Sequence, residues 1–180
     1  MLENCLYLNG FSYVWDCQTV GDVNTFLQQF RERLKDVAFQ NWYAKLSVSK
    51  YLSHYSNVKT LLNVERYVIS LQDKSLRRAL CKFRISLHNF NVQYLRKNSL
   101  DIQSSVCTYC CKGYVESEEH VFFICDRYQI LRAHYMNQLN LLYNGYLSLP
   151  AILNCQNINV IKLTSVYLCK IFNFRKNVTQ

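Results

Sequence analysis

The sequence predicts a mainly α-helical protein, and three observations lead to that fold class. The chain of 180 residues has one proline and four glycines, too few turn residues for a sheet of many strands. Long stretches of leucine, lysine, arginine, glutamine and asparagine between apolar residues favour helices. Half of the residues are hydrophobic and 14% are aromatic, which is enough to bury a core. We therefore expect one globular unit built from helices.

The first predicted helix begins after Asp22, which is a suitable N-cap. Apolar residues recur at helical spacing from Val23 toward Trp42, and polar residues fall between them, so we expect a core-facing helix. Residues 50–71 are compatible with either a short helix or a strand-like connector, because tyrosine, valine and isoleucine suit both. Helical spacing returns in residues 128–142 and again in residues 158–174, where Pro150 marks the preceding turn.

Residues 74–97 form a basic segment with seven basic residues and no acid. Winding its first part as a helix at about 100° per residue gathers apolar residues on one side and basic ones on the other. The apolar side holds Leu76, Ala79, Leu80, Phe83 and Leu87, and the basic side holds Lys74, Arg77, Arg78, Lys82, Arg84 and His88. An ordinary solvated face mixes both signs of charge. A single sign, in a chain of formal net charge +9, favours a phosphate-backbone partner. The candidate nucleic-acid-binding residues are Lys74, Arg77, Arg78, Lys82, Arg84, His88, Arg96 and Lys97.

The stretch CTYCCKGYVESEEHVFFIC, residues 107–125, has the spacing Cys-x2-Cys-x9-His-x4-Cys. The first pair can reach one ion from a tight turn, to which Gly113 lends backbone freedom, and the second pair converges if EEHVFFIC is a short helix. The alternatives are ordinary buried thiols with a polar core histidine, or a redox pair, although the βαβ context of a thioredoxin-type pair is missing. We predict one structural zinc ion in a closed shell of Cys107, Cys110, His120 and Cys125, with Cys111 as a spare thiol.

Motifs for catalysis are absent from the sequence. It has no phosphate-binding glycine loop, no dinucleotide fingerprint, no His-Glu-x2-His and no nucleophile elbow. The 54 residues after Asp126 contain no carboxylate, which argues against a metal-dependent nuclease or polymerase centre there. We interpret the one acidic cluster, Glu116, Glu118 and Glu119, as favourable charge in the first turn of the helix that carries His120. We expect no catalytic residues and no enzymatic activity.

Both chain ends bear on the cellular location. The start, MLENCLYLNG, lacks the basic region of a signal peptide, and Lys162 and Lys170 interrupt the apolar run near the other end. We expect a soluble intracellular protein, in the cytoplasm, the nucleus or both, with no membrane partner. In a reducing compartment the nine cysteines favour buried thiols and one metal site over a disulfide framework.

Three groups of residues together match the pattern of a known family. The segment FRISLHNF fits Arg-Ile-Ser-x-His, and the zinc-knuckle-like stretch that follows adds Glu119 to the four metal-ligand candidates. A third group resembles Arg-Tyr-x2-Leu-Arg. Through these residues the chain resembles the C-terminal region of non-LTR (LINE-type) retrotransposon polyproteins, downstream of the reverse transcriptase domain. The matching residues outside the metal-ligand set are Arg84, Ile85, Ser86, His88, Glu119, Arg127, Tyr128, Leu131 and Arg132.

The resemblance spans about residues 10–175 and is strongest over 76–135. It departs at Asp126, where the family usually has a proline, and at residues 95–97, where Leu-Arg-Lys replaces a typical Gly-Arg-Tyr. The paired aspartates of the polymerase palm are absent from this chain. The resemblance implies a piece that helps a reverse transcriptase hold its RNA template and target DNA. It implies a fragment or a co-opted reading frame, whose partners are nucleic acid and a reverse transcriptase domain missing from this chain.

The predicted organisation has three parts: a helical region with the basic helix in residues 1–100, the CCHC zinc-binding motif in 101–126, and C-terminal helices in 127–180 that pack on the rest. Two functional classes remain. In the first, a nucleic-acid-binding module, the basic helix grips phosphates while Tyr109 and Tyr114 approach unstacked bases. In the second, a zinc-stabilised helical module packs on a missing protein partner.

Overall fold

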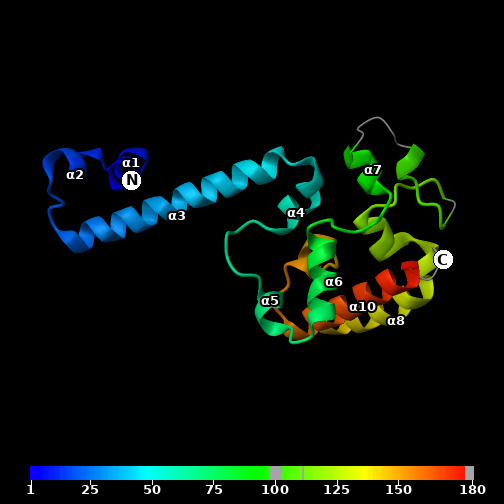
Figure 1. The fold of residues 1–180 in the computed structure, drawn as a ribbon. Coiled ribbons are helices and arrows are strands. Elements are labelled where there is room, and N and C mark those ends of the chain that lie inside the picture. Colours follow the sequence, from blue (N-terminus) through cyan, green and yellow to red (C-terminus); the bar gives the residue numbers. More distant parts are fainter. Residues whose placement is uncertain (98–102, 111, 177–180) are drawn as a thin grey trace. The chain divides into compact units, whose positions relative to one another are not determined.

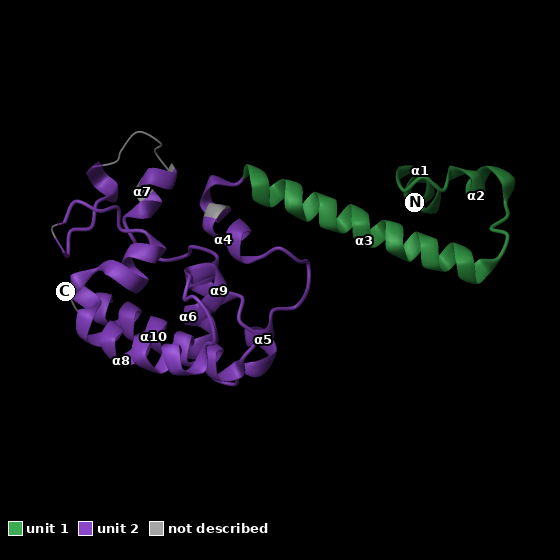
Figure 2. Cartoon of the chain, turned by 180° about the vertical axis from the view of Figure 1, so that it is seen from behind, with its two compact units in different colours: residues 1–48 green, residues 49–180 purple. Residues whose placement is uncertain are grey.

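The computed structural model describes residues 1–97, 103–110 and 112–176. These residues are mainly helical, as predicted, and they form no strand, only an isolated antiparallel bridge between Val106 and Val115. The chain divides into two compact units, unit 1 (Met1–Val48) and unit 2 (Ser49–Gln180), coloured separately in Figure 2. The boundary at residues 48 and 49 differs from the predicted boundaries at residues 100 and 126. The basic helix, the Cys/His stretch and the last helices all belong to unit 2.

Unit 1 consists of two short helices and one long one: α1 (Leu2–Leu8), α2 (Ser12–Cys17) and α3 (Val23–Val48). Asp22 caps α3 as predicted, since the Thr25 N–H donates to its Oδ1 at 2.8 Å. Between the short helices, Phe11 packs edge-on against Phe26 and Phe30 of α3, with ring centroids 5.6 and 5.2 Å away. These aromatic contacts hold the short helices to the first half of α3.

The prediction that α3 faces a core is wrong for most of its length. In the described structure Leu46 is its one buried residue. Leu27 and Leu34, at the centre of the predicted stripe, each keep 40% of their surface exposed. The periodicity indicated the helix correctly, but unit 1 offers too little partner surface to cover the stripe beyond Phe30.

Unit 2 is built around its last helix, α10, which packs against α6 and α8 (Figure 1). The predicted helices in 128–142 and 158–174 are confirmed as α8 and α10, whereas Pro150 lies in the separate short helix α9. Residues 50–71 form short helices rather than a strand. The helices of unit 2 are α4 (Ser53–Val58), α5 (Arg66–Ser70), α6 (Lys74–Arg84), α7 (Val92–Lys97), α8 (Gln129–Leu142), α9 (Leu149–Leu153) and α10 (Ile158–Lys176), with 3-10 turns at Lys50–Leu52, Gln103–Ser105 and Asp126–Tyr128 and a π-helical turn at His120–Ile124.

Three fully buried aromatic residues join the Cys/His stretch to the helices. Phe122, in the π-helical turn, lies 5.9 Å from Phe83 of α6 and 5.0 Å from Tyr167 of α10 between ring centroids. The Tyr167 hydroxyl also donates to the Phe122 carbonyl oxygen at 2.9 Å. The segment that carries His120 and Cys125 is therefore anchored in the core of unit 2.

None of the helices in the described ranges combines the length and the apolar character needed to cross a bilayer. In α10, Lys162 and Lys170 are exposed. The predicted interruption of the apolar run by these lysines thus corresponds to a helix with one solvated side.

Candidate metal centre

Backbone hydrogen bonds around the isolated bridge between Val106 and Val115 position Cys107 and Cys110. The Cys107 N–H donates to the Tyr114 carbonyl and the Glu116 N–H donates to the Ser105 carbonyl, each at 2.8 Å, on either side of the bridge between Val106 and Val115. Gly113 closes the loop with a φ of +72°, in the left-handed region where glycine carries no steric cost. Cys107 therefore lies at the start of this loop, and Cys110 lies within it at the end of a turn over residues 108–110.

A π-helical turn presents the other two ligand candidates. The Cys125 N–H donates to the His120 carbonyl at 2.7 Å, which closes a turn of five residues. In an α-helix, residues five apart would point about 140° away from each other. The wider turn lets side chains at His-x4-Cys spacing converge, so the predicted short helix is present in a modified form. Ser117 supports its start by accepting the His120 N–H at 3.1 Å.

The four side chains form one compact cluster. The ligand atoms of Cys107, Cys110, His120 and Cys125 all lie within 4.8 Å of one another. The Sγ atoms of Cys107 and Cys125 are 3.8 Å apart, and Cys110 Sγ is 3.5 Å from His120 Nε2. Tetrahedral zinc with ordinary bond lengths requires about 3.8 Å between two sulfur ligands and about 3.5 Å between a sulfur and a nitrogen. The cluster is close enough to bind a metal ion and is compatible with one zinc.

The protonation chemistry of the cluster also suits a metal. Burial lowers the pKa of His120, which favours the neutral imidazole that ligates metals. Burial raises the pKa of Cys107, and raises that of Cys125 to about 12, so both thiols hold their protons until a cation displaces them. Backbone N–H groups nearby point to these two sulfur atoms and would stabilise their thiolates; they belong to Tyr109, Cys110 and Arg127.

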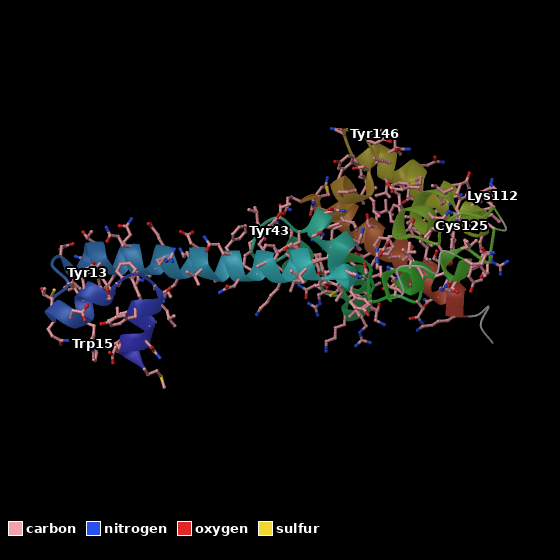
Figure 3. All side chains as sticks on the ribbon, turned by 90° about the horizontal axis from the view of Figure 1, so that it is seen from above. Tyr13, Trp15, Tyr43, Lys112, Cys125 and Tyr146 are labelled. Atoms are coloured by element: carbon pink, nitrogen blue, oxygen red, sulfur yellow. The ribbon has the colours of Figure 1, made fainter. Side chains whose placement is uncertain are left out.

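Two features at the edge of the cluster complete its description. His120 Nδ1 is buried and has no hydrogen-bond partner in the described part of the chain. Lys112 forms an ion pair with Asp126 at 2.7 Å, and it lies at the same end of unit 2 as Cys125 (Figure 3). The predicted spare thiol, Cys111, falls outside the described residues.

The acidic residues beside the cluster do not have the predicted role. Glu118 is buried and accepts hydrogen bonds from the side chains of Ser86 and His88 at 2.7 and 2.8 Å. Arg96 donates to both of its oxygens, at 2.7 and 3.0 Å. Only Glu119 is exposed, at the N-cap of the π-helical turn. The interpretation as favourable charge in the first turn of the helix does not account for Glu118, which is the centre of a buried ion-pair network.

Glu116 has a similar structural role. It is fully buried and forms a bidentate ion pair with Arg175 of α10, and it also accepts the Asn91 N–H at 2.7 Å. The interpretation as helix-start charge is wrong for this residue as well. Glu116 therefore connects the bridged segment beside Cys107 to α10, because its partner Arg175 lies 59 residues further along the chain.

The structure separates the predicted nucleic-acid-binding residues into two sets. Arg84 is 1% exposed, forms an ion pair with Glu65 at 2.9 Å and donates to the Leu153 carbonyl. His88 and Arg96 are held by Glu118. The prediction that Arg84 and His88 lie on an open basic side of the helix is wrong, because their acidic partners are distant in sequence and a helical projection does not show them.

The remaining basic residues of α6 match the prediction better. Lys74, Arg78 and Lys82 are exposed. Arg77 is half-buried and donates to the Val68 carbonyl at 3.4 Å. On the opposite side of α6, Ala79, Leu80 and Phe83 are buried, as the periodicity predicted. The helix ends at Arg84, however, and Leu87 beyond it is 67% exposed, so the prediction is wrong for that residue. The side chain of Lys97 lies outside the described part of the structure.

The pKa of Glu118 predicts how stability depends on acid. Burial by itself raises the pKa of a carboxyl, but hydrogen bonds from His88 and Arg96 hold the pKa of Glu118 well below its ordinary value of 4.5. Such a group stabilises the folded chain above its unfolded pKa, and that stability is lost as pH falls toward the folded pKa. We expect the free energy of unfolding, measured in urea, to decline from about pH 5 to about pH 3. Glu118→Gln should flatten the decline; an equally steep decline in this variant would contradict the assignment.

Comparisons with known proteins do not identify the chemistry of this site. A scan against protein-family models and searches of curated proteins and of solved structures give no match to the chain. What the geometry establishes is one buried Cys/His cluster that could hold a metal ion, flanked by two buried carboxylates that neutralise arginines of the same chain.

Proposed function

We propose that the chain is a non-catalytic nucleic-acid-binding module with one structural zinc ion. By resemblance, it would be the C-terminal module of a non-LTR retrotransposon reverse transcriptase, present as a fragment or a co-opted reading frame. The observation that carries the proposal is a row of exposed basic side chains on α6, Lys74, Arg78 and Lys82, which we call the basic row.

The distribution of charge supports this function. Residues 49–180 contain 17 of the 21 basic residues and 7 of the 12 acidic ones, so their formal net charge is +10, against −1 for residues 1–48. Four of those acids, Glu65, Glu116, Glu118 and Asp126, already form ion pairs inside unit 2. Among the basic residues outside these ion pairs, Lys74, Arg78 and Lys82 of α6 are exposed and available to a polyanion.

The geometry of the basic row suits a phosphate backbone. Its three members are four residues apart, so they rise by about 6 Å from one to the next along the same side of α6. None of the three has an acidic partner among the residues described. The buried residues Leu80 and Phe83 fix the helix in the core, which holds the row in place. Contacts of this kind would bind phosphates without reading sequence.

Aromatic groups near the Cys/His cluster add a second element to the proposal. Tyr114 is 54% exposed, which leaves its ring open to stack on an unpaired base. Tyr109 is half-buried, and the Arg175 guanidinium lies 4.9 Å from its ring centroid. We therefore assign base stacking to Tyr114 and not to Tyr109.

Zinc is the ion that best fits the donor set. Three thiolates and one imidazole form a closed tetrahedral shell, which leaves no position for a reacting water molecule. Glu116 and Glu118 bind arginines, so neither is placed to hold a catalytic magnesium ion. These arrangements support a stabilising role for the metal and a module without enzymatic activity.

A second candidate function is a zinc-stabilised helical module that packs on another protein. The exposed apolar residues of α3, among them Leu27 and Leu34, favour this alternative. It predicts protein association and almost no dependence of RNA binding on salt. A single titration with RNA at two salt concentrations therefore distinguishes the two candidate functions.

Neutralising the basic row should weaken nucleic-acid binding without unfolding the protein. The triple variant Lys74→Gln, Arg78→Gln, Lys82→Gln removes three candidate phosphate contacts, which for a single strand lowers the slope of log affinity against log salt by about 2. The effect should be similar for all RNA sequences. Affinity for single-stranded RNA and for duplex DNA would be measured by fluorescence anisotropy at two salt concentrations.

A matched control removes the same charge elsewhere. Arg31→Gln, Arg33→Gln, Lys35→Gln changes three exposed basic residues of α3 and should leave most of the affinity in place. Melting temperatures of both variants should stay near that of the parent chain, because exposed substitutions change stability by about 0.5 kcal/mol or less each. If a folded basic-row variant keeps the parent affinity and salt slope, the proposed function fails and the protein-interaction module replaces it.

A further inference from the structure

A heptad repeat of apolar residues runs the whole length of α3. In the notation of coiled coils, the core positions a and d recur with alternating spacings of four and three residues. All but one of the eight positions are apolar, and the exception is Asn41 at an a position. The d positions are Val23, Phe30, Val37 and Ala44, and the a positions are Leu27, Leu34, Asn41 and Val48.

This seam, the eight a and d positions of α3, is largely open within unit 1. Val23 and Val48 at its two ends are 55% and 83% exposed, and Leu27 and Leu34 between them are 40% exposed. Phe30 and Val37 are half-buried, and Phe11 covers one edge of the Phe30 ring at 5.2 Å between centroids. Apolar residues in such a stripe gain stability only when a second helix covers them.

We propose that α3 pairs with α3 of a second copy of this chain, as a parallel two-stranded coiled coil over residues 23–48. Asn41 indicates that the helix covering the seam is a second copy of α3. In a parallel pair in register the two Asn41 side chains face each other and can hydrogen-bond, which is the way one buried asparagine fixes two strands and their register. In an antiparallel pair aligned over its full length, Asn41 would instead face the ring of Phe30 and lose its partner.

The flanking positions are compatible with this pairing. In a parallel dimer, g residues lie beside the e residues that follow in the partner. Here Arg33 would lie beside Ala38, and Gln40 beside Lys45, so no like charges meet. Outside the seam, Phe39 at an f position contacts Trp42 at a b position and Tyr43 at a c position, so these aromatic residues lie on a different face of α3.

Pairing through unit 1 has a consequence for the whole molecule. Each dimer would carry two copies of unit 2, the unit that holds the excess positive charge. Two linked binding modules raise the effective affinity for one long polyanion without any new contact. The pairing itself depends on α3 alone and stands whether or not unit 2 binds nucleic acid.

The oligomeric state of the full-length chain tests the proposal. Sedimentation velocity over chain concentrations on the order of 1–100 µM should show a reversible monomer–dimer equilibrium. Leu34→Asp places a charge in the seam and should abolish the dimer. Tyr43→Asp is the matched control: Tyr43 is 59% exposed on α3 (Figure 3) and occupies a c position, so the dimer should persist.

A variant that strengthens association shows that loss of the dimer in Leu34→Asp is not caused by misfolding. Asn41→Leu removes the buried amides and should tighten association by about tenfold or more while admitting species larger than dimers. An unfolded α3 could not produce that gain. A chain that stays monomeric at every concentration, in the parent and in Asn41→Leu, would overturn the proposal. So would a Leu34→Asp dimer as stable as that of the parent.

Discussion

Removing the metal, by chelation or by Cys110→Ala, should sharply lower the melting temperature of unit 2 and reduce its helical circular dichroism. In the described residues between Ser105 and Asp126, regular structure is limited to the bridge between Val106 and Val115 and the short helical segment that ends in the π-helical turn, which is too little to persist alone. In small sites of this kind the free energy of metal binding is free energy of folding. With free zinc about a thousandfold above its dissociation constant, the loss is about 4 kcal/mol.

A cysteine outside the cluster provides the control for this experiment. Cys155 is half-buried in unit 2 and is not part of the Cys/His cluster, so Cys155→Ala should leave the response to chelator unchanged. Thermal melting followed by circular dichroism, with and without chelator, compares the three proteins. Identical melting of the parent and Cys110→Ala, each indifferent to chelator, would show that no metal stabilises the fold.

Replacing Glu118 with alanine should destabilise the protein by about 3–5 kcal/mol, the second large effect that we expect. The substitution leaves Arg96 and His88 without their acidic partner at a site where Glu118 is 3% exposed. An unpaired buried charge costs far more than the ion pair contributed, because the charge has been taken out of water. Unfolding in urea would measure the difference.

The neighbouring residue makes a close comparison. Glu119→Ala removes the same side chain one position along, but Glu119 is exposed and should change stability by about 0.5 kcal/mol or less. Equal destabilisation by the two variants would mean that Glu118 contributes through general charge and not through its buried network.

Local patterns predicted the four longest helices, α3, α6, α8 and α10, because a helix depends on residues near one another in sequence. The cap at Asp22, the periodicity of α8 and α10 and the two-sided character of α6 all follow from spacing within a few turns. The spacing of Cys107, Cys110, His120 and Cys125 likewise indicated one cluster, and the geometry places their ligand atoms together. Metal ligands are predictable because the ion requires few donors of particular types.

The ion pairs were not predictable by the same means. Arg84 seemed to belong with Lys82 on an exposed face, yet it pairs with Glu65, and Arg175 pairs with Glu116 across 59 residues. A helical projection shows on which side of a helix a residue lies, but it does not show that the last residue of α6, Arg84, is buried in the core. One signal was present in the sequence: acids are scarce in a basic unit, so each of them has many possible partners and is readily drawn into an ion pair.

The burial of α3 was mispredicted for a related reason. Its apolar stripe indicates that some surface covers it but does not say whether that surface belongs to the same chain. Leu27 and Leu34 satisfy the pattern of a core helix and the pattern of a coiled-coil seam equally well. Only the exposure of these residues in the folded unit separates the two interpretations.

The metal content of the purified protein tests the central claim most directly. Native mass spectrometry of the chain produced in zinc-replete medium should give one zinc ion per chain, and Cys110→Ala should carry none. Cobalt added to the stripped protein should give the absorption of a tetrahedral site with thiolate ligands, and the variant should not. A parent chain that is folded, metal-free and silent toward cobalt would contradict the assignment of Cys107, Cys110, His120 and Cys125 as ligands of one zinc ion.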